Sequence, residues 1–104
     1  DDEHAAKLAE AYPFYTTYPI PGGSYKGVDN DVQTVAIKAT LIASPKLSED
    51  VVYNLTKAIF ENKEEIAGAH AKGAELSTEY ATTGISVPFH PGAEKYFKEV
   101  GALK

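Results

Sequence analysis

Three histidines are the side chains of this sequence best suited to bind a metal ion. They are His4, His70 and His90, and no HxxxH or HExxH pattern relates them. A zinc site built from them would need a favourable tertiary arrangement and an added carboxylate. The sequence has no cysteine, which excludes thiolate ligands and disulfides. We therefore expect solvated or locally hydrogen-bonded histidines, with no metal site and no cofactor.

Groups that could act as nucleophiles or bind phosphate also lack their usual context. Gly22-Gly23-Ser24 is not followed by a Walker lysine, and no G-x-G-x-x-G occurs, so a tight turn is expected there. None of the serines lies in a nucleophile-elbow motif. The acidic run at residues 61–65 lacks the alternating ligands and the glycine of a calcium loop. The residues therefore show no visible catalytic set.

Aromatic residues crowd into one stretch that is also rich in proline and glycine. Such rings on a structured loop can line a small-molecule cleft. They can equally cover a small hydrophobic core. Both interpretations stay open for the five residues concerned, which are Tyr12, Phe14, Tyr15, Tyr18 and Tyr25.

The size and charge of the chain limit the kinds of molecule that it is expected to bind. A chain of 104 residues is enough for one domain, and its 43% hydrophobic and 24% charged residues are ordinary values for a globular protein. The net charge is −5 and no cluster of lysine or arginine exists, so nucleic acid is not an expected partner. No apolar run approaches the roughly 20 residues of a membrane-spanning helix.

The first third of the chain predicts a helix and an irregular segment. Ala5, Leu8, Ala9 and Tyr12 have the spacing of one helical face, which predicts a helix over residues 1–12 that ends at Pro13. Residues 15–18 predict a short strand. Residues 20–25 predict a turn with a positive φ at a glycine.

The middle of the chain predicts a strand followed by a long helix. Residues 35–43 alternate in the manner of a strand. Ser48 is a good N-cap, and Glu49 and Asp50 suit the first turn of a helix. Packing of the strand against this helix is expected to form the core. The apolar stripe expected on the helix consists of Val51, Val52, Leu55, Ile59, Phe60 and Ile66.

The last third predicts two shorter helices. Glycines at 68 and 73 indicate that the long helix ends or kinks in that range. Ser77 is suited to cap a short helical turn. Pro91 is placed near the first position of a final helix, and Gly101 suits the position just after its end.

Six strings, taken in order, resemble the C-terminal portion of the TAXI family of TRAP transporter solute receptors. The resemblance covers nearly the whole chain, and the closing His-Pro-Gly-Ala-Glu-Lys-Tyr string is its most specific part. The strings are residues 12–15, 20–27, 31–36, 47–53, 56–62 and 90–96.

The resemblance implies an α/β fold: a C-terminal fragment of a type II periplasmic-binding-protein fold, helix-rich with a few strands. Residues 1–104 would form one fragment of a two-lobed protein, which accords with a first residue other than Met. The implied function is a periplasmic, extracytoplasmic receptor that binds a small organic acid or an amino acid such as glutamate. It would deliver this solute to a TRAP membrane permease. Tyr25 and Thr34 are the expected solute contacts.

One alternative stays open. A ligand-sensing or protein-interaction module can share the two-lobed binding fold, and the aromatic loop would then be a partner surface. A DNA-binding segment encoded upstream would favour the module, whereas a secretion signal there would favour the receptor. Under the receptor interpretation, open strand edges and an uncovered helix stripe predict self-association of the chain.

Overall fold

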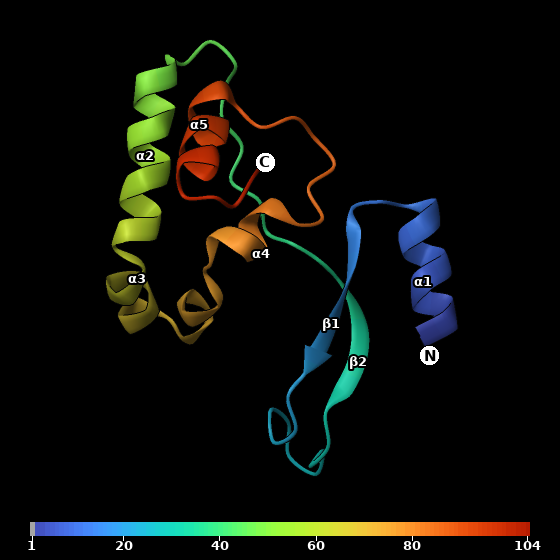
Figure 1. The fold of residues 1–104 in the computed structure, drawn as a ribbon. Helices are drawn as coiled ribbons and strands as arrows, with labels where there is room; N and C mark the ends of the chain where they lie inside the picture. Colours follow the sequence, from blue (N-terminus) through green and yellow to red (C-terminus); the bar gives the residue numbers. More distant parts are fainter. Residues whose placement is uncertain (1) are drawn as a thin grey trace. The chain divides into compact units, whose positions relative to one another are not determined.

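The computed structural model describes residues 2–104 and has the mixed helix and strand content expected from the sequence (Figure 1). The fold is α/β and helix-rich, with one small two-stranded sheet. The chain divides into two compact units, which we call the hairpin unit (up to Thr40) and the helical unit (residues 41–104). The elements are α1 (Asp2–Ala11), β1 (Tyr15–Ile20), β2 (Val32–Ile37), α2 (Glu49–Glu61), α3 (Lys63–Ala69), η1 (Ala71–Glu75), α4 (Thr78–Thr82) and α5 (Pro91–Glu99).

In the hairpin unit, α1 packs beside an antiparallel pair of strands. The predicted helix and the predicted short strand are both confirmed as α1 and β1. Ala5 is the residue of α1 that is buried, and Asp2 and Glu3 lie in its first turn, where they complement the helix dipole. The register places Tyr18 opposite Thr34, and Tyr15 opposite Ile37.

The connection between the strands is closed by hydrogen bonds from two backbone amides. The Gly22 amide donates to the Asp31 carboxylate at 2.8 Å, and the Gly23 amide donates to the Val28 carbonyl at 2.7 Å. Gly23 has a φ of +82°, which confirms the predicted glycine turn. A Cβ on Gly22 would lie 2.2 Å from the Asp29 carbonyl oxygen, so this close approach requires glycine.

The predicted strand over residues 35–43 is wrong at both ends, because β2 runs from Val32 to Ile37. Its partner β1 begins at Tyr15, opposite Ile37, so β1 offers no backbone partner to the residues that follow. The Thr40 hydroxyl donates instead to the Lys38 carbonyl at 3.2 Å. Leu41 and Ile42 are 75% and 81% exposed. Alternating side chains indicate a strand, but they do not show how far its neighbour extends.

In the helical unit, α2 packs along α5 (Figure 1). The predicted N-cap is confirmed, since the Ser48 hydroxyl accepts from the Val51 amide. Val52 and Thr56 form the buried side of α2, whereas Val51 and Leu55 are exposed. Only part of the expected apolar stripe is therefore buried: Val52 is packed, while Val51 and Leu55 face solvent. The strand β2 belongs to the hairpin unit and α2 belongs to the helical unit, so the expected packing of strand against helix stays a prediction.

The helix that follows Ser48 is interrupted at Asn62, earlier than the predicted kink. The Asn62 side-chain amide donates to the Ala58 carbonyl at 2.8 Å, and its backbone amide donates to the same carbonyl at 3.2 Å. Local bonds of this kind compete with a continuing helix. α3 then runs to Ala69, so the predicted end between residues 68 and 73 is confirmed.

The last helices have the ends that the sequence predicts. The Ser77 hydroxyl accepts from the Tyr80 amide at 3.1 Å and caps α4. Pro91 is the first residue of α5. After α5, Gly101 has a φ of +76°, the Gly101 amide donates to Lys98, and the Ala102 amide donates to Phe97. This bond pair is a Schellman motif, for which glycine is the preferred residue.

Candidate functional site

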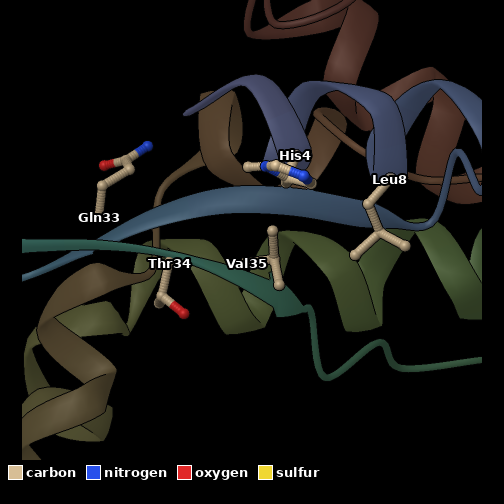
Figure 2. A pocket seen from close by; sticks show the side chains of 6 residues that line it. His4, Leu8, Gln33, Thr34 and Val35 are labelled. Atoms are coloured by element: carbon tan, nitrogen blue, oxygen red, sulfur yellow. The ribbon is translucent and has the colours of Figure 1, made fainter. Parts of the chain in front are cut away.

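A shallow hollow of about 240 Å³ lies between α1 and β2 in the hairpin unit (Figure 2). Helix periodicity brings His4, Ala5 and Leu8 to one side of α1, since residues three or four apart share a face. Gln33 and Val35 share one side of β2 because side chains alternate along a strand. The lining residues are His4, Ala5, Leu8, Gln33, Thr34 and Val35.

Thr34 lies at this hollow, but its side chain leaves the strand on the other side. Figure 2 shows the Gln33 amide and the Thr34 hydroxyl projecting from opposite sides of β2. Thr34 is paired with Tyr18, so these two side chains share a face of the hairpin. The predicted solute contact is thus adjacent to the hollow, and its hydroxyl faces the side occupied by Tyr18.

Tyr25 lies on the loop between the strands and is 66% exposed. It forms an isolated bridge with Val28, whose amide donates to the Tyr25 carbonyl at 3.1 Å. Tyr25 does not line the hollow. The two predicted contacts therefore share the hairpin unit, but the structure does not bring them into one pocket. The sequence did not single out Gln33 or Val35; the signal that could have found them is their spacing on the strand that carries Thr34.

The remaining aromatics of this segment form an exposed cluster. The Phe14 ring centroid lies 5.9 Å from that of Tyr12 and 5.0 Å from that of Tyr15. The Tyr12 and Tyr15 centroids are 6.3 Å apart. Tyr12 and Phe14 are exposed and Tyr15 is half-buried, so this group is not a buried plug. None of the three lines the hollow.

The most specific string of the sequence joins α5 to the start of α2. His90 Nδ1 accepts from the Gly92 amide at 3.2 Å and caps α5. Its Nε2 lies 3.1 Å from the Leu47 carbonyl oxygen. A carbonyl oxygen only accepts, so Nε2 is the donor of this bond and both ring nitrogens are hydrogen-bonded. The expectation of a locally hydrogen-bonded histidine is confirmed here.

Gly92 and Lys95 complete this contact, which we call the α2–α5 clasp (His90, Gly92 and Lys95 against Leu47, Glu49 and Tyr53). A Cβ on buried Gly92 would lie 2.2 Å from the Glu49 carbonyl oxygen and 2.6 Å from the Tyr53 amide. Lys95 forms an ion pair with Glu49 at 3.1 Å, and its ammonium lies 5.3 Å from the centre of the Tyr53 ring. The string therefore has a packing role.

Hydrogen bonds and burial shift four pKa values. The hydrogen bond from the Tyr53 hydroxyl to Glu99, at 2.7 Å, and then partial burial raise the pKa of Tyr53. The bond to Glu49 raises the pKa of Lys95. Burial raises the pKa of Tyr96. Burial has the opposite sign for an amine, and it lowers the pKa of Lys38 in the hairpin unit.

The three histidines lie on different elements. His4 is on α1 and His90 caps α5, while His70 Nδ1 accepts from the Lys72 amide at 3.1 Å. Within residues 2–104, no three His, Asp or Glu side chains are grouped so that they could hold a metal ion. Among the helices described, none is long and apolar enough to cross a membrane.

Both units fall within one family. The model of the NMT1-like family matches residues 1–101, a range that includes the hollow, the Tyr25 loop and the α2–α5 clasp. This family is of the periplasmic-binding type and is associated with transport receptors, which supports a solute-binding role in broad terms. Because the match covers nearly all of the sequence, the chain belongs to the NMT1-like family.

Proposed function

We propose that the chain is part of the solute-binding receptor of a TRAP-type secondary transporter of the TAXI class. The observation that carries the proposal is the family match over residues 1–101. The ordered strings that resemble TAXI receptors support the finer assignment. The receptor binds a small organic acid or an amino acid and delivers it to the membrane permease. It is periplasmic and performs no chemical step on the solute.

Within this proposal, Tyr25 and Thr34 contact the solute. Thr34 is supported by its position on a strand whose partner is fixed in register, where its hydroxyl shares a face of the hairpin with Tyr18. Tyr25 is supported by the closed loop that carries it, because a ring on an ordered loop loses little further freedom on binding. The exposed apolar residues Val51, Leu55, Leu41 and Ile42 support the further proposal that the chain associates with another protein surface, including a second copy.

Isothermal calorimetry on the complete gene product tests the proposal. A panel of acidic amino acids, dicarboxylates and monocarboxylates is titrated, and saturable heat is expected with at least one compound. Tyr25→Ala and Thr34→Val should each weaken that binding about tenfold, which corresponds to about 1.4 kcal/mol. Tyr80→Ala, at an exposed tyrosine of the helical unit, is the matched control and should bind normally. Absence of heat across the whole panel would contradict the proposal.

A further inference from the structure

The hollow between α1 and β2 has room for part of a small solute. Its volume is about 240 Å³. Pockets that enclose whole drug-sized ligands begin at about 300 Å³. The hollow therefore suits a group of a few heavy atoms that belongs to a larger molecule.

The lining combines a few polar side chains with apolar walls. Ala5, Leu8 and Val35 are apolar, and none of the six lining residues is lysine or arginine. Gln33 projects on the side of β2 that it shares with Val35 (Figure 2). Its primary amide has two donor hydrogens and an acceptor oxygen. Such a group can both donate a hydrogen bond to an amide or a hydroxyl of a ligand and accept one from it.

The charges near the hollow disfavour an anion. Asp2 and Glu3 precede His4 in the first turn of α1, and the ammonium of Lys7 is engaged with Glu3 at 2.7 Å. The dipole of α1 favours negative charge at this end, but the two acidic side chains already complement it. A carboxylate entering the hollow would lose water, and no lysine or arginine lines the hollow to compensate that loss.

We propose that this hollow receives an uncharged hydrogen-bonding group of the solute, an amide or a hydroxyl, while any carboxylate is bound elsewhere. The inference rests on the proposed receptor function and adds to it the chemical class of one subsite. Gln33 is the specificity-determining residue of this subsite. Leu8 and Val35 supply the apolar walls against which the carbon skeleton packs.

Propionamide and propionate are suitable probes because they have nearly the same shape and differ in charge. Each is added to the isotope-labelled protein, and shifts are followed by NMR at the Gln33 side-chain amide and at the backbone amides of Ala5, Leu8 and Val35. Propionamide is expected to bind about threefold or more tightly than propionate, a difference of about 0.7 kcal/mol. Gln33→Leu should abolish this preference, whereas Asn54→Leu on the exposed side of α2 should preserve it.

Equal or stronger binding of propionate would overturn the inference, as would the absence of shifts with both probes. If Gln33→Leu gave the spectrum of a folded protein and still preferred propionamide, Gln33 would not be the specificity-determining residue. These results are separable from failure of the receptor proposal. Calorimetric heat with an organic acid, without any amide preference at the hollow, contradicts the subsite alone, whereas absence of heat across the panel contradicts the receptor.

Discussion

Tyr96 and Phe97 of the helical unit are buried in a group of rings that includes Phe60, while Tyr12 and Phe14 of the hairpin unit form an exposed ring cluster. The α2–α5 clasp also brings two backbones into direct contact at Gly92. The hollow lies in the hairpin unit, where Ala5 is the buried hydrophobic residue among those that the structure describes. The difference shows that the string over residues 90–96 serves packing, whereas the candidate site lies in the unit that has fewer buried side chains.

Truncating one phenylalanine in each unit tests this contrast most strongly. Phe97 is 5% exposed and contacts the rings of Phe60 and Phe89, each with a centroid distance of 5.5 Å. Phe97→Ala should lower the free energy of unfolding of the helical unit by about 3–5 kcal/mol. Phe14→Ala, at a residue 41% exposed, should cost only about 1 kcal/mol. Native-state hydrogen exchange measures both units, and similar losses in the two variants would break the contrast.

The backbone contact in the clasp gives the next largest effect. Gly92→Ala forces a Cβ into the first turn of α2, and α5 must move, at an expected cost of about 2–3 kcal/mol. Gly68→Ala is the matched control, because a Cβ there meets no atom within 4 Å and lies in a helix. That variant should gain about 0.5 kcal/mol. Urea denaturation monitored by circular dichroism compares the two, and effects of the same sign would argue against a close contact at Gly92.

His90 contributes a cap and a tether, which two variants separate. His90→Ala removes both and should cost about 1–2 kcal/mol. His90→Asn retains a side chain that can cap α5, so it should recover roughly half of that loss. The measurement is again the urea midpoint. If asparagine were no better than alanine, the cap would not be part of the contribution of His90.

Alkaline pH should give the smallest effect, with opposite signs in the two units. The pKa values of Tyr53 and Lys95 are raised in the folded state, so their stabilisation is complete below pH about 10. It is lost as the pH rises through the raised values. The lowered pKa of Lys38 acts in reverse: the cost of its buried charge is relieved as the pH rises.

Thermal unfolding between pH 8 and 11 measures this effect. Tyr53→Phe, which removes the titrating hydroxyl, should reduce the alkaline loss in the helical unit. Lys38→Met should remove the compensating gain in the hairpin unit. An alkaline loss that is unchanged in Tyr53→Phe would show that the bond to Glu99 does not contribute to it.

Much of the local structure could be predicted because local side chains determine it. Ser48 and Ser77 cap helices through their own hydroxyls, and Gly101 takes a backbone conformation that glycine favours. The end of β2 could not be predicted, since it depends on where β1 begins. The interruption at Asn62 depends on a side-chain bond to Ala58 that competes with an otherwise helical sequence.

The candidate site was harder to predict from the sequence, because it also depends on residues that are far apart in the chain. Of the two predicted solute contacts, Thr34 lines the hollow and Tyr25 does not. His4 lines the hollow because α1 packs against the sheet. No motif links residues 4 and 33. Their proximity follows from tertiary contacts, which a single sequence does not encode in any spacing.

The contacts of the clasp also fix the direction of α5. Gly92 meets the start of α2 while Phe97 meets Phe60 near its end, so the two helices run parallel. Parallel helices need a return connection as long as the helix, about 20 Å for the 13 residues of α2. About six extended residues would span that distance. The connection over residues 63–89 is much longer than that. A shortened connection should therefore still allow α2 and α5 to pack in parallel.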